Sequence, residues 1–171
     1  MEKTNFYIFL DIDGVMYDWD YYIQEVKEKR LKKKDLFSHF KPESIYALNL
    51  LISELSKKNN VQLVISSTWR SVMSKAVSTL KNNGLIYDKP IERTTLKGLP
   101  FYRGRQILDY LYDKTNYDFV IIDDEMFDFK EHFKPQNIIK TEMFHSALSV
   151  KMVKEFLSAR EHKNQENIIS E

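Results

Sequence analysis

At 171 residues the chain fits one domain with a sizeable core, and its formal net charge of +1 gives no overall reason to expect binding to nucleic acid or membranes. Such a partner has to be supported by a local patch of charge. The chain has no cysteine, which excludes disulfides and thiolate metal sites and is consistent with a reducing compartment.

The first apolar run, from Phe6 to Leu10, is too short for a signal peptide or a membrane span, so we expect a cytoplasmic protein without a membrane segment. This run leads directly into Asp11, Asp13 and Gly14, as when a buried parallel strand ends at a site. Alternate side chains share a face of an extended chain, and glycine allows a tight turn out of the sheet. Because two carboxylates this close repel each other unless a cation or proton lies between them, the pattern indicates a metal.

A lone Asp-x-Asp also occurs in calcium loops, in sugar-nucleotide metal sites and at ordinary strand ends. An EF-hand loop fits poorly, because it would place further oxygen ligands at alternating positions and a glutamate at the twelfth, between two helices. Here a strand precedes the motif and Gly14 follows it directly. The motifs further along the chain are needed to distinguish a catalytic metal site from a sugar-nucleotide site or an ordinary strand end.

Residues 16–41 form an insert without a clean period. It holds six basic residues in the eight from Lys27 to Lys34, a run that usually forms a solvated helix face. If the run flanks a site, it would attract a polyanion. The insert is short, so we expect only a small cap.

A helix is predicted from Pro42, because proline suits a first turn and Glu43 suits the positive end of the helix dipole. The pattern stops at Asn59 and Asn60, after apolar residues at helical spacing: Ile45, Leu48, Leu51, Ile52 and Leu55. Residues 61–65 are predicted to form the second strand. This strand runs into the segment Ser66-Ser67-Thr68-Trp69-Arg70, so hydroxyls lie where it ends.

A further amphipathic helix is predicted over residues 72–80, and Gly84 can take the left-handed cap position after it. Residues 85–99 indicate mostly loop, with at most one short strand around Ile86 or Ile91. Arg103, Gly104 and Arg105 open the next helix. A further buried strand is predicted over residues 119–122 and ends in Asp123 and Asp124. We also predict a short last strand over residues 137–140, a last helix over residues 150–157 and a polar tail from residue 160.

This alternation predicts an α/β fold with a doubly wound, Rossmann-like parallel sheet and a minimal cap. We expect one domain over residues 1–171, with the basic insert 16–41 and the polar tail 160–171. Ligands of such folds bind at the carboxyl ends of the strands, where three pairs can converge: Asp11 and Asp13, Ser66 and Ser67, Asp123 and Asp124.

Carboxylates with hydroxyls and an arginine, without ligand-spaced histidines or cysteines, favour a hard cation such as Mg²⁺. Phosphoryl transfer needs an in-line nucleophile, neutralisation of the charged oxygens and a proton for the leaving oxygen. Asp11 can attack phosphorus and Asp13 can supply the proton. The other roles fall to Ser66 and Arg103 for the phosphoryl oxygens, and to Asp123 or Asp124 for the metal.

The segments FLDIDGV, VISSTWR and VIIDDE, in this order, resemble motifs one, two and four of the haloacid dehalogenase-like (HAD) phosphatase superfamily. The chain is similar, over about residues 6–157, to the phosphatase-type domains of bacterial and phage RNA-repair proteins. Those domains carry a similar SSTWR segment, an Arg-Gly pair opening the next helix and an Asp-Asp strand end.

The resemblance implies that Asp11 is nucleophile and metal ligand, and that Asp13 is the acid/base with its carbonyl on the metal. It implies a phosphate-binding hydroxyl on Ser66, beside Ser67, and a Mg²⁺ site completed by Asp123 or Asp124. The basic residue of the third motif is Arg103, with Arg105 and then Lys97 as alternatives. The second aspartate of the first motif is absent from true dehalogenases, so Asp13 favours a phosphohydrolase.

The function implied is a Mg²⁺-dependent phosphomonoesterase working through an aspartyl-phosphate, with polynucleotide 3′-phosphate ends as the leading substrate. Nucleotides and phosphoproteins are alternatives. A receiver-like phosphate-sensing module would place its acidic pair after the first strand and its phosphoacceptor Asp on the third, whereas here the first strand ends in Asp-x-Asp-Gly and the adjacent pair comes late. A glycosyltransferase using Asp-x-Asp does not explain the serine and Asp-Asp strand ends. Among the other residues, we expect Trp69 in the core or the site wall and Arg70 paired with a carboxylate. Asp128, four residues after Asp124, matches a spacing that some family members use for metal support, but ranks below the Asp pair.

Overall fold

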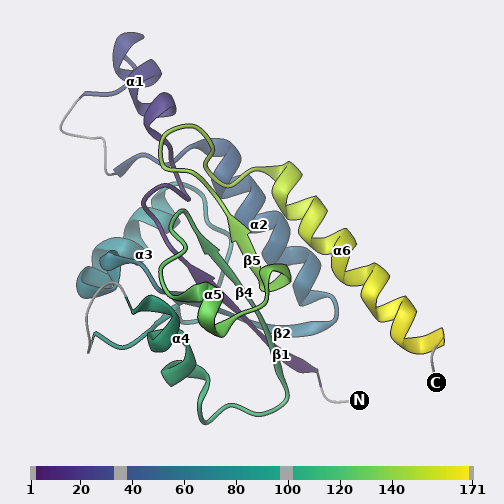
Figure 1. Ribbon diagram of the computed structural model, residues 1–171. Helices are drawn as coiled ribbons and strands as arrows, with labels where there is room; N and C mark the ends of the chain where they lie inside the picture. The colour runs from purple at the N-terminus through teal and green to yellow at the C-terminus, as the bar shows by residue number, and fades with distance from the viewer. Residues whose placement is uncertain (1–2, 33–37, 97–101, 170–171) are drawn as a thin grey trace.

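The structure, a computed structural model, describes residues 3–32, 38–96 and 102–169, with side chains up to residue 161. It contains a five-stranded, all-parallel sheet in the order β3-β2-β1-β4-β5 (Figure 1). The strands are β1 (Thr4–Leu10), β2 (Asn59–Ile65), β3 (Glu92–Arg93), β4 (Tyr117–Asp123) and β5 (Ile138–Lys140). β1 lies in the centre between β2 and β4, which confirms the predicted doubly wound α/β sheet.

Side chains of β1 alternate between two cores, one on each face of the sheet. Phe6, Ile8 and Leu10 contribute to the first core, under α2 (Pro42–Ser56), α3 (Met73–Asn82) and α6 (Val150–Ile169). Tyr7 and Phe9 contribute to the second core, under α4 (Arg103–Leu111) and α5 (Phe129–His132). Because both faces of β1 are covered, its run of apolar residues is continuous, as in a central parallel strand.

The structure differs from the sequence prediction in the bounds of some elements and contains short elements that were not predicted. β2 begins at Asn59 rather than at residue 61, because Asn59 and Asn60 pair through their backbones with Thr4 and Asn5 at the start of β1. The last helix continues through the polar tail to Ile169, since the tail is rich in glutamate, lysine, glutamine and arginine, which are good helix formers. The short 3-10 helices η2 (Thr68–Val72) and η3 (Pro135–Asn137) and the helix α5 have no periodicity that predicts them.

The insert contains a helix, α1 (Trp19–Lys27), which extends past the carboxyl ends of the strands (Figure 1). Asp18 is 1% exposed and holds both ends of this insert. Its carboxylate accepts hydrogen bonds from the backbone N–H of Tyr21 at 2.7 Å and from Lys41 Nζ at 2.9 Å, and also from the N–H of Ala147 in the loop after β5 at 3.2 Å. The described part of the insert is therefore a small cap fixed at its base.

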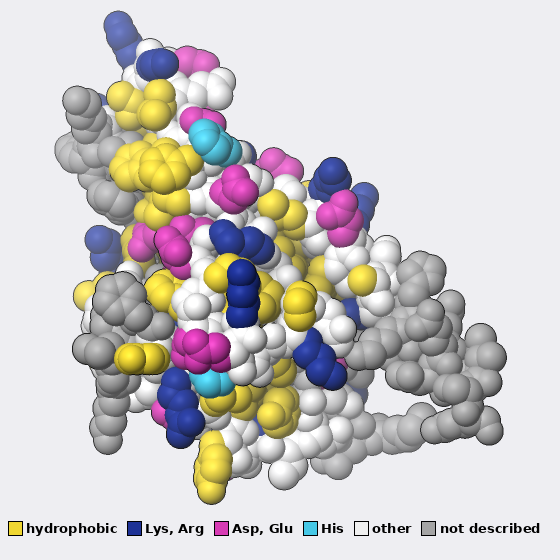
Figure 2. All heavy atoms as spheres, viewed as in Figure 1, with side chains coloured by type: hydrophobic (Ala, Val, Ile, Leu, Met, Phe, Trp, Pro, Cys, Tyr) yellow, Lys and Arg dark blue, Asp and Glu magenta, His cyan; other side chains and the backbone are white. Residues whose placement is uncertain are grey.

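The basic run of the insert carries exposed Lys27, Lys29 and Lys32, whereas Arg30 forms ion pairs with Glu25 and Glu28 of the same segment. Lys33 and Lys34 lie outside the described residues. In Figure 2 basic and acidic side chains are interspersed over the visible face, so no field of a single sign dominates it. Within the described part of the chain, no helix is both long enough and apolar enough to span a membrane.

Candidate active site

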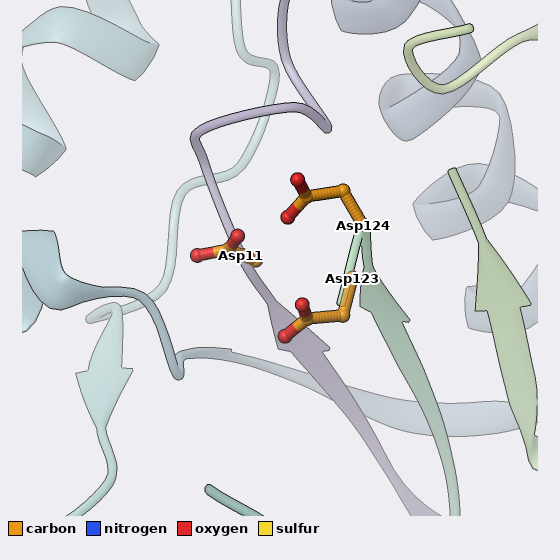
Figure 3. A group of neighbouring side chains, drawn as sticks. All are labelled: Asp11, Asp123 and Asp124. Carbon is orange, nitrogen blue, oxygen red and sulfur yellow. The ribbon is translucent and has the colours of Figure 1, made fainter. Parts of the chain in front are cut away.

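The carboxyl ends of β1 and β4 bring three aspartates together. Leu10 lies opposite Ile122 in the parallel ladder, so Asp11, Asp123 and Asp124 come next to each other where the two strands end. One carboxylate oxygen from each lies within 4.8 Å of the others (Figure 3). Among the described residues, this is the acidic cluster with the geometry to hold a metal ion.

The electrostatics of this cluster favour a bound cation. Burial raises the pKa of Asp124 to about 7, and the negative charge of Asp11 contributes to the shift. Burial also raises the pKa of Asp123, which is 0% exposed, again with a contribution from Asp11. Because an added cation relieves both the desolvation and the mutual repulsion, the carboxylate set fits a hard divalent ion such as Mg²⁺.

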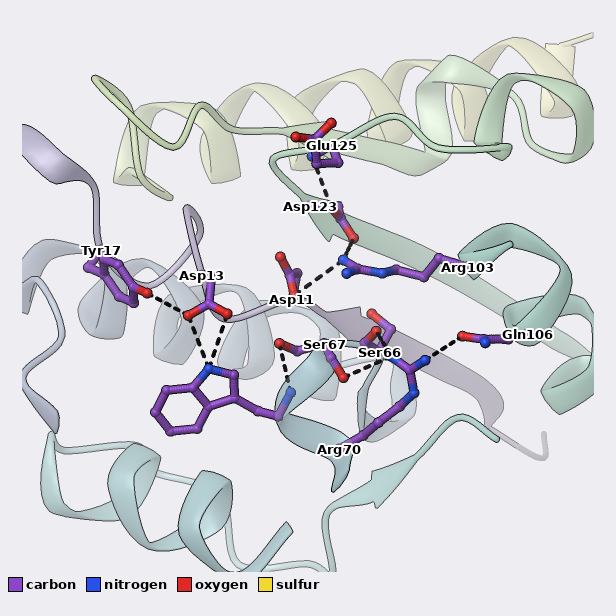
Figure 4. A network of polar contacts seen from close by, with 11 residues as sticks. Asp11, Asp13, Tyr17, Ser66, Ser67, Arg70, Arg103, Gln106, Asp123 and Glu125 are labelled. Atoms are coloured by element: carbon purple, nitrogen blue, oxygen red, sulfur yellow. Dashed lines mark hydrogen bonds and ion pairs between the residues drawn. The ribbon is translucent and has the colours of Figure 1, made fainter. Parts of the chain in front are cut away.

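Arg103, at the first position of α4, lies across the aspartates (Figure 4). Its guanidinium donates to Asp123 Oδ2 at 2.5 Å and lies 3.2 Å from Asp11 Oδ1. Burial works to lower the pKa of Arg103, but Asp11 and Asp123 outweigh it and raise that pKa above its ordinary value. Its Nε has no hydrogen-bond partner among the described residues, which leaves a buried donor for a ligand.

Arg105 does not reach the site. The side chain of Arg105 is 68% exposed and forms an ion pair with Asp109, one turn further along α4, at 3.2 Å. Lys97 lies outside the described residues. Of the basic residues expected to bind phosphate, the structure brings Arg103 to the aspartates and leaves Arg105 on the outer surface of the helix.

Ser66 and Ser67 follow β2, next to Asp11. Ser66 is 0% exposed, its backbone N–H donates to the carbonyl of Leu10 at 3.0 Å, and its Oγ has no hydrogen-bond partner among the described residues. Ser67 Oγ instead accepts from the N–H of Trp69 at 3.3 Å and caps η2. A buried hydroxyl without a partner costs free energy, so Ser66 is the better candidate to bind a phosphoryl oxygen.

Asp13 lies beside this cluster, and its carboxylate has partners of its own (Figure 4). Tyr17 donates its hydroxyl proton to Asp13 at 2.5 Å, and Trp69 Nε1–H donates to the two carboxylate oxygens at 3.0 and 3.2 Å. Burial raises the pKa of Asp13, and the charge of Asp11 raises it further. Trp69 is 8% exposed, so it is a wall residue, as the sequence predicts.

Comparison with known proteins identifies the family. A family model for the HAD domain in Swiss Army Knife RNA repair proteins matches residues 7–153. The chain belongs to this family. No curated protein and no solved structure matches the chain. Membership indicates a HAD-type hydrolase, in general a phosphatase, and it agrees with the three motifs at the strand ends.

The glycine of the first HAD motif is required by the approach of Asp124. Gly14 has a φ of +72°, and a Cβ at this position would lie 2.5 Å from Asp124 Cγ. A side chain here would both strain the backbone and push the Asp124 carboxylate away from Asp11. Gly14 thus allows the acidic cluster of Asp11, Asp123 and Asp124 to form without adding a carboxylate of its own.

A second glycine, Gly104, allows Asp128 to hold the start of α4. The Asp128 carboxylate accepts from the N–H of Gly104 at 2.6 Å and from the N–H of Arg105 at 2.9 Å. A Cβ on Gly104 would lie 2.8 Å from Asp128 Oδ1. Asp128 is not among the three aspartates whose oxygens lie close enough to share an ion, and it fixes the helix start that carries Arg103.

Gly104→Ala should therefore lower activity through Arg103. The added methyl group displaces the Asp128 carboxylate, and a shift of about 1 Å in a positioning group can cost roughly 100-fold in rate. The measurement is kcat/KM for phosphate release at a temperature where the variant is folded.

Gly84→Ala is the matched control for this variant. Gly84 has a φ of +100° and lies next to Ile45, away from the aspartates, so alanine there should reduce the melting temperature and leave kcat/KM unchanged. Equal losses of activity in the two variants would show that Gly104 matters only for folding.

Arg70 supports the serine loop. It is 6% exposed, and its guanidinium donates to the carbonyls of Ser66 and Ser67 at 2.9 Å each and to Gln106 Oε1 at 2.8 Å. The prediction that Arg70 pairs with a carboxylate is wrong, because carbonyl and amide oxygens take its donors. Arg70 links the end of β2 to α4 and fixes Ser66 relative to Arg103.

Proposed function

We propose that this HAD domain is a Mg²⁺-dependent phosphomonoesterase that works through an aspartyl-phosphate on Asp11. The observation that carries the proposal is the placement of buried Asp11 between two carboxylates and a buried arginine. Alongside lies the hydroxyl of Ser66, which has no hydrogen-bond partner in the described part of the chain. This set of groups can bind a cation and a phosphoryl group at one point. Asp11 is the member that both can contact.

In the first step Asp11 attacks phosphorus and the bond from phosphorus to the leaving oxygen breaks. Asp13 donates a proton to that oxygen, so the alcohol leaves neutral. In the second step water attacks the aspartyl-phosphate and Asp13 takes the proton from the water. Inorganic phosphate leaves, and the carboxylate of Asp11 is restored.

Ser66 Oγ and the Arg103 guanidinium are suited to hold the phosphoryl oxygens during both steps. Asp11, Asp123 and Asp124 would hold Mg²⁺, together with the carbonyl of Asp13. Bound Mg²⁺ supplies positive charge that offsets the charge of the carboxylates and of the phosphoryl oxygens. Trp69 and Tyr17 keep the Asp13 carboxylate aimed beside Asp11 rather than into the cluster.

The leading substrate is a nucleic-acid end, above all a 3′-phosphate. The family is described by its occurrence in RNA repair proteins, and the described part of the cap is one helix with its flanking segments, which suits a large substrate. Nucleotides and phosphoproteins are the alternatives within the same chemistry.

A phosphatase screen tests the proposal. We expect phosphate release in the presence of Mg²⁺, loss of release with a chelator, and recovery when Mg²⁺ is added back in excess. The panel contains oligonucleotides phosphorylated at either end, mononucleotides, sugar phosphates and phosphopeptides, and the 3′-phosphorylated oligonucleotide should give the highest kcat/KM. No phosphate release from any of these compounds would favour the receiver-like sensing module instead. Preference for a phosphopeptide would contradict the nucleic-acid substrate but not the phosphatase activity.

A further inference from the structure

A groove begins at Asp13 and continues between the start of α1 and the segment formed by η2 and α3. It has a volume of about 540 Å³ and is open to solvent. Its apolar lining comes from Trp19, Trp69, Val72 and Met143, and its cation is Lys75. In Figure 2 hydrophobic side chains gather directly below α1.

The groove lies on the side of the site from which the leaving group departs. Asp13 lines its inner end and is the residue that protonates the leaving oxygen in the proposed mechanism. Trp69 joins the two regions, because its Nε1–H bonds to Asp13 at 3.0 Å while its side chain lines the groove. A group attached to the leaving oxygen would therefore enter this groove.

The walls of the groove are aromatic and well supported. The ring of Trp19 packs edge-on against Tyr22, with 6.1 Å between ring centroids, and Tyr22 stacks on Tyr17 at 4.4 Å. Phe40 continues the cluster between Tyr17 and Trp69. The backbone N–H of Trp19 also donates to the carbonyl of Met143 at 2.9 Å. Such preorganised walls bind a flat ring with little ordering cost.

The chemistry of the lining fits one nucleotide unit. Lys75 Nζ lies 5.2 Å from the centroid of the Trp69 ring, so an anion on Lys75 would lie next to a ring held by the aromatic wall. A nucleoside with its linking phosphate offers both groups, and the volume is within the range of about 300–1,000 Å³ of small-molecule sites. A phosphotyrosine side chain fits less well, because its ring is bonded directly to the reacting oxygen and carries no second anion.

We propose that this groove binds the terminal nucleoside of a nucleic-acid end, with its base against Trp19 and its linking phosphate on Lys75. The inference rests on the proposed phosphatase function and names the part of the substrate that the site recognises. It assigns recognition to stacking and one cation rather than to the basic run of the insert, where Arg30 is already paired with Glu25 and Glu28.

The first test is binding, without turnover. The chain has two tryptophans and both line the groove, so intrinsic tryptophan fluorescence reports on this place alone. The probe is a dinucleotide with a free 3′-hydroxyl, which is a reaction product, added to the wild-type protein with Mg²⁺. We expect saturable quenching, because a base stacks on the indole rings. Absence of saturable quenching would overturn the proposal.

Two variants make this measurement specific. Lys75→Ala should raise the dissociation constant of the dinucleotide by up to about fivefold, as for an exposed ion pair, and leave that of a mononucleoside unchanged. Lys81→Ala, at the exposed end of the same helix, is the control and should change neither. Equal effects of the two variants would show a general charge effect and contradict the assignment to Lys75.

The second test is kinetic. Trp19→Ala should raise KM for a 3′-phosphorylated dinucleotide roughly tenfold, Trp19→Phe should restore most of the loss, and neither should change kcat/KM for acetyl phosphate, which has no base.

Equal changes for both substrates would overturn the groove assignment and leave the phosphatase intact. Hydrolysis of neither substrate by the wild-type protein would reject the proposed function, while the quenching experiment decides on the groove separately. If Trp19→Ala impairs hydrolysis of a phosphotyrosine peptide more than hydrolysis of the dinucleotide, the assignment of the groove to a nucleoside would be overturned.

Discussion

Asp11→Asn should abolish turnover and leave the fold intact. The amide has nearly the shape of the carboxylate but is a poor nucleophile, so kcat should fall by roughly 10⁴-fold or more, as when a covalent nucleophile is removed from other enzymes. The melting temperature without metal should not fall, because the substitution removes a negative charge that raises the pKa of both Asp123 and Asp124. Steady-state phosphate release and thermal unfolding measure the two effects.

The matched control is Asp109→Asn. Asp109 lies on the exposed side of α4 and pairs with Arg105, so the same chemical change there should leave kcat and KM unaltered. If Asp11→Asn retains more than a tenth of the wild-type activity, the covalent mechanism is excluded. The metal cluster would then have to act on water directly.

The convergence of the strand ends could be predicted from the sequence. Asp11, Ser66 and Asp123 each follow a run of apolar residues that only a buried parallel strand explains. Once β1 lies between β2 and β4, the residues that end these three strands have to be neighbours. Hydrophobic pattern and chain order therefore predict the fold and the meeting of these three strand ends.

The supports of the site could not be predicted in this way, because their partners are mostly backbone groups. Arg70 binds the carbonyls of Ser66 and Ser67, and Asp128 binds the amides of Gly104 and Arg105. Every residue offers a carbonyl, so no sequence pattern marks such an acceptor. The sequence signal of the Asp128 contact is Gly104, the residue after Arg103. A glycine is needed there because Asp128 approaches the backbone closely.

The prediction of an insert without a clean period is wrong for the helix α1. Asp18 caps its start and its apolar residues recur at helical spacing, and the backbone N–H of Trp19 donates to the carbonyl of Met143 at 2.9 Å. These contacts also place Trp19 beside Asp13 in the groove. The insert therefore contributes to the site through aromatic side chains that charge patterning did not reveal.

Asp13→Asn should impair the reaction in a way that depends on the leaving group. General acid catalysis contributes about 10²–10⁴-fold, so kcat/KM for an alkyl phosphate should fall by this factor. The loss for p-nitrophenyl phosphate should be about tenfold or less, because p-nitrophenolate is a stable anion that leaves without a proton. Tyr17→Phe keeps the ring but removes the hydroxyl that donates to Asp13, and should show the same trend with smaller losses.

The choice of kcat/KM is essential to this prediction. In the proposed mechanism Asp13 also takes a proton from water in the second step, which is the same for every substrate because the leaving group has already departed. If that step limits kcat, the variant lowers kcat equally for both phosphates and hides the dependence on the leaving group. The ratio kcat/KM includes only the steps up to formation of the aspartyl-phosphate, so it isolates the protonation of the leaving oxygen. Equal losses of kcat/KM on both substrates would mean that Asp13 acts only as a structural partner of Tyr17 and Trp69.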